Sequence, residues 1–272
     1  MRNPRNHNQV SKINLSPDVV DCIIYWTKNP KNMLKRLDEL KDYQYYFQFS
    51  VTEYGKDTEP FVPHKRDEMI LTFQELSCKV GTDRIIWRYD PIFINSTYTI
   101  EYHLRAYSTI AKELRGYSKK VIISLIDFHP KIKKNMDSLT ITIPTDEDVI
   151  ELCSHLVKIA KENDFLIEMC AEQYGIAYAS CVDKALIEQL IGYEIIGKKD
   201  RNQRVDCGCV ESINIGTYDT CRNGCKYCYA NFNDKKVKNT SSMYDENSPL
   251  LCSRITDKVT IKERSVKSLK RH

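Results

Sequence analysis

Short runs of β-branched and aromatic residues alternate with longer segments of helical period, and this alternation constrains the fold of the chain more than any other feature. The short runs predict five strands, at residues 21–27, 45–52, 84–91, 120–127 and 165–170. The longer segments predict helices at residues 31–40, 65–80, 99–114, 145–163 and 183–191. Strands that are joined by crossover helices form parallel sheets. The sequence therefore predicts an α/β protein.

The predicted strands are apolar along most of their length, as in Val121-Ile-Ile-Ser-Leu-Ile126. This pattern is typical of a sheet that is covered on both faces. A chain of 272 residues can bury one large core, and α/β barrels of this length are single domains. We expect an incomplete (β/α)6 barrel of the TIM type over residues 1–197.

Polar side chains gather where the predicted strands end, which in a parallel barrel is the mouth at which chemistry takes place. Some of these side chains can instead be helix caps or members of salt bridges at the strand ends. We expect the following residues to hold cofactor and substrate: Lys28, Glu53, Arg88, Asp90 and Glu172.

Three cysteines lie close together in one short segment, Cys221, Cys225 and Cys228, with Tyr227 just before the last of them. Thiolates at this spacing can wrap one face of a cubane iron-sulfur cluster and bind one iron each, which leaves the fourth iron open to a small molecule. We therefore predict a 4Fe-4S cluster on these cysteines, with Tyr227 packed beside it. A structural zinc site, which requires a fourth ligand from outside the segment, is one alternative, and thiols with no shared role are the other.

Four more cysteines form a second possible metal site, namely Cys170, Cys181, Cys207 and Cys209. Cys170 closes the last predicted strand, and the last two belong to a compact Cys-Gly-Cys turn. Four thiolates complete either a second cluster or a tetrahedral zinc site, and the spacing does not choose between them. In the alternative interpretation Cys170 is an ordinary buried residue, and the Cys-Gly-Cys turn is either a redox pair or a chance occurrence.

The helical and strand periodicity fades after residue 197. Residues 198–252 are predicted to be a cysteine-rich segment that folds over the open mouth of the barrel and binds the cluster. Residues 253–272 are rich in Lys and Arg and show no core pattern, which is typical of a basic, disordered tail.

Composition excludes several classes of protein. The 41 basic and 37 acidic residues give a formal net charge of +4, so the surface is mixed and lacks the basic footprint of a nucleic-acid-binding protein. The chain begins without the apolar stretch of a signal peptide, and it contains no run of about 18 apolar residues. A soluble, cytoplasmic protein is predicted, whose 11 cysteines are available for metal. No phosphate-binding glycine loop, serine hydrolase elbow or zinc peptidase motif is present.

Five stretches carry a resemblance to a known family, at residues 20–30, 45–50, 87–91, 207–212 and 220–230. On these stretches the chain is similar to the domain of unknown function 1848 family, whose C-terminal cysteines resemble those of radical S-adenosylmethionine enzymes. The Trp-Thr-Lys-Asn-Pro sequence in the first stretch also resembles the spore photoproduct lyase group, which repairs a DNA photoproduct by radical chemistry.

The resemblance implies reductive cleavage of S-adenosylmethionine, abstraction of hydrogen from a substrate, and an electron donor such as a flavodoxin or ferredoxin. Members of the family carry a further segment ahead of the point at which this chain begins, so the expected barrel lacks its first strand. Members of the superfamily place the cluster loop after the first strand, whereas here it follows the last. The main alternative function is a non-catalytic metalloprotein, in which zinc or a cluster staples the tail to the barrel. A nucleic-acid repair factor is a third possibility, which rests on the resemblance to the lyase group and on the basic tail.

Overall fold

A parallel sheet of five strands forms the centre of the fold. The computed structural model describes residues 1–3, 6, 8–128, 130–170, 172–201, 203–204 and 206–271. The strands of the sheet follow one another in chain order: β2 (Ile23–Thr27), β3 (Tyr45–Ser50), β4 (Ile85–Ile92), β5 (Lys120–Leu125) and β6 (Leu166–Met169). The predicted mixed α/β fold with a parallel sheet is confirmed. Within the described residues β2 and β6 remain edge strands, and closure into a barrel is not observed.

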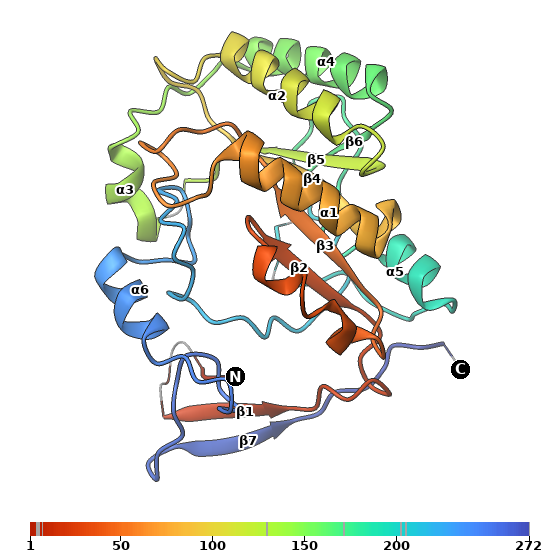
Figure 1. The fold of residues 1–272 in the computed structure, drawn as a ribbon, viewed down its shortest axis with the longest axis vertical. Helices are drawn as coiled ribbons and strands as arrows, with labels where there is room; N and C mark the ends of the chain where they lie inside the picture. The colour runs from red at the N-terminus through yellow and green to blue at the C-terminus, as the bar shows by residue number, and fades with distance from the viewer. Residues whose placement is uncertain are drawn as a thin grey trace.

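Helices cover one face of this sheet (Figure 1). They are α1 (Leu71–Val80), which continues a π-helical turn at Lys65–Ile70, α2 (Ile100–Leu114) and α4 (Asp146–Glu162). Their apolar side chains pack with every second residue of the strands, such as Phe47, Phe49 and Val51 of the β3 region, into the largest buried cluster.

A capping box begins α4, in the place where the sequence predicts one. The Thr145 hydroxyl accepts from the amide of Asp148 at 3.2 Å, and the Asp148 carboxylate accepts from the amide of Thr145 at 3.1 Å.

The helix expected at residues 31–40 is absent, and two short 3-10 helices, Lys31–Met33 and Leu37–Leu40, take its place. Leu34 is the buried residue of this segment, at 8% exposure. One buried side chain per ten residues gives a helix too little tertiary packing to offset its ordering entropy.

The opposite face of the sheet changes character along the strands. Near the amino ends, Tyr46, Ile86 and Ile122 form a second buried cluster with the segment that follows β6 and with α5 (Lys184–Ile191). Toward the carboxyl ends the same face carries Gln48 and Arg88, both buried. The sheet is therefore covered on both faces, but one face turns polar at the edge where the strands end, which we call the carboxyl edge.

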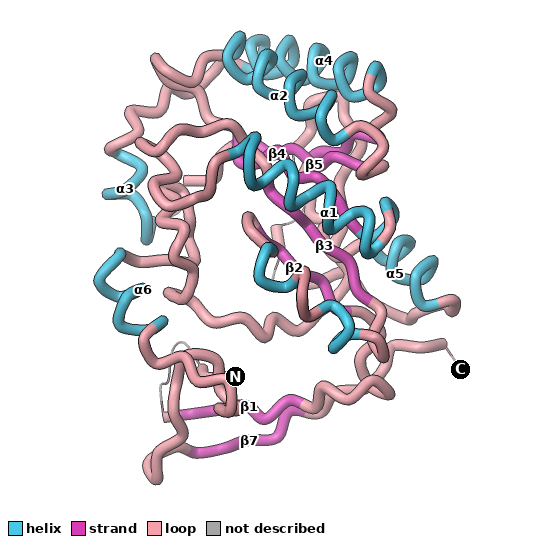
Figure 2. Tube along the Cα trace, viewed as in Figure 1, coloured by secondary structure: helices cyan, strands magenta, loops and turns pink. Residues whose placement is uncertain are grey.

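From Gly192 to Asn233 the chain runs as a long loop without a helix or an extended strand among its described residues (Figure 2). This loop contains both the Cys-Gly-Cys turn and the three clustered cysteines. Residues 55–62, the loop after β3, contact it, and we call them the strap segment.

Four further elements were not expected from the sequence: β1 (Gln9–Ile13), α3 (Lys133–Asp137), α6 (Asp234–Ser241) and β7 (Thr260–Arg264). β1 and β7 pair in parallel at one end of the molecule, as a separate two-stranded sheet (Figure 1). All five residues of β7 are exposed. A strand that is held by backbone hydrogen bonds and buries no side chain has no alternating apolar pattern in its sequence. The prediction of a disordered tail at residues 253–272 is therefore wrong for residues 260–264, which form β7.

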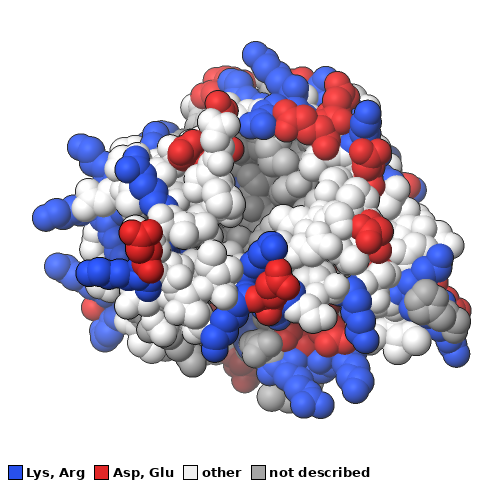
Figure 3. Space-filling model, turned by 90° about the horizontal axis from the view of Figure 1, so that it is seen from below, with Lys and Arg blue, Asp and Glu red and all other residues white. Residues whose placement is uncertain are grey.

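The charged side chains are mixed on the surface, as composition predicts. On the face in Figure 3, Lys and Arg are interspersed with Asp and Glu around a hollowed centre. This face shows no large area of a single charge.

Candidate functional site

The three clustered cysteines lie in a loop, residues 221–228, which we call the cysteine loop. Two backbone hydrogen bonds hold it against the strap segment. The amide of Phe61 donates to the carbonyl of Asn223 at 3.2 Å, and the amide of Lys226 donates to the carbonyl of Thr58 at 3.1 Å. Because the strap segment belongs to the loop that follows β3, these bonds bring the cysteine loop to the carboxyl edge.

Gly224 permits this close approach. Its φ of +68° lies in the left-handed region, and a Cβ atom at this position would lie 2.8 Å from the ring of Phe61. A larger residue would strain the backbone and separate the loop from the strap segment.

Short-range hydrogen bonds shape the cysteine loop itself. The amide of Cys228 donates to the carbonyl of Cys225 at 3.1 Å, and the Asn231 side chain donates to the carbonyl of Cys221 at 2.8 Å. Cys221 is exposed, whereas Cys225 and Cys228 are half-buried. All three cysteines therefore belong to one short loop, in which Cys221 is the exposed member.

Burial raises the pKa of Cys225 to about 12, and burial also raises the pKa of Cys228. Cysteine binds a metal as the thiolate. Any metal that uses these two sulfurs must displace their protons, so its binding is coupled to proton release.

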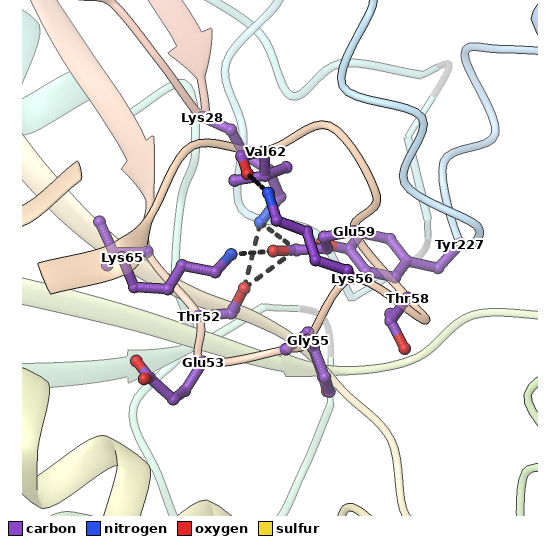
Figure 4. A network of polar contacts seen from close by, with 12 residues as sticks. Lys28, Thr52, Glu53, Gly55, Lys56, Thr58, Glu59, Val62, Lys65 and Tyr227 are labelled. Atoms are coloured by element: carbon purple, nitrogen blue, oxygen red, sulfur yellow. Dashed lines mark hydrogen bonds and ion pairs between the residues drawn. The ribbon is translucent and has the colours of Figure 1, made fainter. Parts of the chain in front are cut away.

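A buried carboxylate, Glu59 of the strap segment, organises the strand ends beneath the cysteine loop (Figure 4). The Lys28 ammonium lies 2.8 Å from one Glu59 oxygen, and Lys65 binds the other. The Thr52 hydroxyl donates to Glu59 at 3.1 Å, and the Tyr227 hydroxyl also donates to it. Residues from the ends of β2 and β3, from the π-helical turn and from the cysteine loop therefore meet at one carboxylate.

Opposite charges keep this buried network ionised. Burial acts to raise the pKa of Glu59, but the Lys28 and Lys65 ammonium groups outweigh it and lower that pKa to about 2. Burial acts to lower the pKa of Lys28, yet Glu59 and then Cys225 hold it above its ordinary value. Burial lowers the pKa of Lys65. The ammonium group of Lys28 thus lies in the field of both the carboxylate and the cysteine loop.

A second polar network surrounds Arg88 of β4. Its guanidinium forms an ion pair with Asp90 at 2.5 Å and donates to Gln48 at 3.1 Å. Asp90 also accepts from the Ser50 hydroxyl at 3.0 Å. One guanidinium nitrogen donates to the sulfur of Cys181 at 2.8 Å. Burial opposes the charge of Arg88, but Asp90 and Cys181 raise its pKa well above the ordinary value.

The four cysteines of the second predicted set, the thiol quartet, lie near one another. The sulfurs of Cys170 and Cys181 are 3.8 Å apart. Hydrogen bonds from the thiols of Cys170 and Cys209, and then the charge of Arg88, hold the pKa of Cys181 well below its usual range. The Cys181 thiolate correspondingly raises the pKa of Cys170 and that of Cys209, which also contacts Cys207.

The remaining predicted site residues lie apart from these two networks. Glu53 follows β3, its carbonyl accepts from the Tyr102 hydroxyl at 2.6 Å, and its carboxylate points away from Glu59 (Figure 4). The Glu172 carboxylate accepts from the amide of Leu125 at 3.0 Å, which ties the loop after β6 to the end of β5. Burial raises the pKa of Glu172.

Sequence reasoning missed Glu59, Lys65 and Gln48. Glu59 lies in a loop, where no periodicity marks a residue as buried, and Lys65 begins a predicted helix like any exposed lysine. Gln48 carries a weak signal, because it is a polar residue in the middle of the apolar run Tyr45–Ser50. A polar side chain inside a buried strand needs a partner, and Arg88 is that partner.

Among the residues that the structure describes, no group of three or more His, Cys, Asp and Glu side chains is placed to hold a single metal ion. A cubane cluster binds each of its cysteines through a different iron, and its ligands are therefore spread around a larger object than one ion. No helix of the described chain has the length and apolar character that a membrane span requires.

The fold and the site define a parallel α/β protein in which a cysteine loop is held at the carboxyl edge of the sheet. The chain belongs to the family described as Domain of unknown function (DUF1848), whose family model matches residues 1–230. The match includes the whole five-stranded sheet, the thiol quartet and the cysteine loop. A search of the curated proteins finds no match.

Proposed function

We propose that this chain is an iron-sulfur enzyme of the radical S-adenosylmethionine type, in which Cys221, Cys225 and Cys228 hold a 4Fe-4S cluster. When bound, the cluster supplies an open iron and an electron for the reductive cleavage of S-adenosylmethionine, which leads to hydrogen abstraction from a substrate. In this proposal the open sheet is an incomplete (β/α) barrel, because its strands follow chain order as barrel strands do.

The position of the cysteine loop carries the proposal. Three thiols from one short loop lie at the carboxyl edge of a parallel sheet, above a network that includes Lys28 and Glu59. Ligands and cofactors of α/β proteins bind at this edge. The donor set also fits, because soft thiolates at this spacing suit iron-sulfur clusters.

The residues under the loop have defined tasks in this proposal. Lys28 places a positive charge near Cys225, which favours the thiolate that a cluster requires. Tyr227 fixes the loop through its bond to Glu59, and its ring packs 5.9 Å from that of Tyr54. The network therefore orients the loop and supplies charge, and its members are engaged with one another.

A cavity of about 420 Å³ beside this network is a candidate site for S-adenosylmethionine or substrate. Its lining includes Glu53, Glu59, Lys65 and Arg66. A volume of this order suits a small organic ligand, and the mixed charges suit a ligand that carries both ammonium and carboxylate groups. Glu53, one of the predicted cofactor-binding residues, lines this cavity, and its carboxylate points away from the Glu59 network. In this proposal Glu53 contacts the ligand.

Anaerobic reconstitution with iron and sulfide tests the cluster. The wild-type protein should bind about four irons per chain and turn brown. The triple variant Cys221→Ala, Cys225→Ala, Cys228→Ala should lose both signals, while Cys78→Ala, which removes an exposed thiol of α1, should keep them. A triple variant that retains the chromophore contradicts the assignment of the cluster to this loop.

Release of 5′-deoxyadenosine tests the enzymatic step. The reconstituted wild-type protein should produce it from S-adenosylmethionine when it receives electrons from a flavodoxin or a chemical reductant. The contacts that position the cysteine loop also attach the C-terminal segment to the sheet. The same arrangement is therefore expected if the metal has a purely structural role. A protein that purifies with zinc and releases no 5′-deoxyadenosine supports that non-catalytic alternative.

A further inference from the structure

Cys181 is held in place by two strands of the sheet. Its backbone carbonyl accepts hydrogen bonds from the Tyr46 hydroxyl at 2.7 Å and from the Gln48 side chain at 2.9 Å, both in β3. Its sulfur accepts from Arg88 of β4 at 2.8 Å. Three hydrogen bonds to one half-buried residue define its position and the direction of its sulfur.

Arg88 is positioned to stabilise a thiolate at Cys181. Its own orientation is set by Asp90, which accepts from two of its nitrogens at 2.9 and 2.5 Å. A guanidinium next to a sulfur favours the charged form, which is the nucleophilic form of cysteine. The geometry is that of an activated thiol.

Cys170 is the adjacent thiol that can pair with it. The loop between the two cysteines folds back on β6, because the amide of Met169 donates to the carbonyl of Ala177 and the amide of Ala179 donates to that of Met169, both at 2.8 Å. The two sulfurs are 3.8 Å apart. A disulfide needs about 2.05 Å between sulfurs, a closure of roughly 1.8 Å, which is within the reach of small side-chain rotations.

We propose that Cys181 and Cys170 are a reversible dithiol–disulfide pair, with Cys181 as the attacking thiolate and a hydroperoxide as the oxidant. The Cys181 sulfur attacks one peroxide oxygen, the O–O bond breaks, and the product is a sulfenic acid with release of hydroxide or alkoxide. The Cys170 sulfur then attacks the Cys181 sulfur, the S–O bond breaks, and water leaves with the Cys170 proton. The peroxide has gained the two electrons that the thiols have lost, and two equivalents of an external thiol return them and leave as a disulfide.

Oxidation would change the polar network at the carboxyl edge. Arg88 loses the thiolate as an acceptor and keeps Asp90 and Gln48. The loop between the two cysteines becomes covalently closed on the end of β6. The pair therefore reports the redox state to Arg88, one of the residues that surround the proposed active site.

Peptide mapping of the full chain tests the pair. The anaerobically purified protein is treated with a stoichiometric amount of hydrogen peroxide, alkylated, digested without reduction and analysed by mass spectrometry. We expect a peptide that joins Cys170 to Cys181 and that disappears after dithiothreitol. The Cys170→Ser variant should instead accumulate sulfenic acid at Cys181, which a dimedone probe detects.

Two controls separate this proposal from others. The triple alanine variant of the cysteine loop should form the same cross-link, because the pair does not require the proposed cluster. Absence of the cross-link in the oxidised wild-type protein, or its loss in that variant, overturns the proposal. Protection of Cys170 and Cys181 from peroxide by bound zinc, with zinc content lost in Cys181→Ser, also overturns it and assigns the thiol quartet to metal.

Discussion

The Tyr227 hydroxyl donates a hydrogen bond to the buried carboxylate of Glu59, and this contact joins the cysteine loop to a loop 168 residues away in the chain. Glu59 is almost completely buried, at 1% exposure, and it also binds two lysines. The carboxylate of this one glutamate therefore connects the ends of the strands, the strap segment and the cysteine loop.

Glu59→Gln should destabilise the protein by about 3–5 kcal/mol, because it leaves Lys28 and Lys65 buried without a charge partner. Chemical denaturation at neutral pH measures this change in the free energy of unfolding. Glu39→Gln is the matched control, since Glu39 pairs with Arg36 on the exposed surface, and it should produce no measurable change. A loss at Glu59 as small as that at Glu39 would contradict the charge network.

Acid should remove the contribution of Glu59. The pKa of its carboxyl is lowered from 4.5 to about 2, so ionised Glu59 stabilises the fold above pH 4.5, and this contribution is lost as pH falls from 4.5 toward 2. The difference in unfolding free energy between wild type and Glu59→Gln should shrink by roughly 3 kcal/mol over this range. Denaturation curves at several acidic pH values measure it, and a difference that is independent of pH argues against a depressed pKa.

His103 should make stability depend on pH in a higher range. It is buried, one ring nitrogen lies 2.9 Å from the Tyr89 hydroxyl, and the other lies 2.9 Å from the Phe93 carbonyl. Burial lowers its pKa from 6.5 to about 4. The unfolded chain therefore takes up a proton below pH 6.5 that the folded chain does not bind until about pH 4, and stability should fall across that range.

The His103→Gln variant isolates this effect, because glutamine bonds without titrating in this range. The slope of unfolding free energy against pH between 6.5 and 4.5 should be smaller in this variant than in wild type, by an amount that corresponds to the uptake of at most one proton on unfolding. His155→Gln, at an exposed position of α4, should keep the wild-type slope. Equal slopes in wild type and His103→Gln would show that His103 is not held neutral.

Gly208→Ala tests the close packing of the Cys-Gly-Cys turn. A Cβ atom at Gly208 would lie 2.4 Å from the hydroxyl oxygen of Ser180, the residue before Cys181. The substitution should cost about 1–3 kcal/mol of stability. Ser180→Ala removes that oxygen and leaves its own Cβ at 3.7 Å, an ordinary contact, so the double variant should regain most of the loss. A double variant as unstable as Gly208→Ala alone would show that the loss of stability does not come from the clash with the Ser180 hydroxyl.

Local patterns in the chain predict the elements and their order well. The five strands, α2, α4 and the capping box at Thr145 all rest on interactions within a few residues, so propensity and periodicity reveal them. The spacing of Cys221, Cys225 and Cys228 is also a local property, because all three belong to one short loop. By contrast, β7 pairs with β1 through the backbone, and its exposed side chains give no signal.

Tertiary structure decided which charges face one another. The sequence predicts Arg88 and Asp90 at the end of a strand. It does not predict the contact between Arg88 and the sulfur of Cys181, because this contact depends on a loop that returns from β6 to β4. Glu59 is unremarkable in the sequence and becomes the centre of a network because Lys28, Lys65 and Tyr227 are packed around it. A side chain's burial and its ionic partners arise from contacts across the chain, and residue type and local spacing do not contain them.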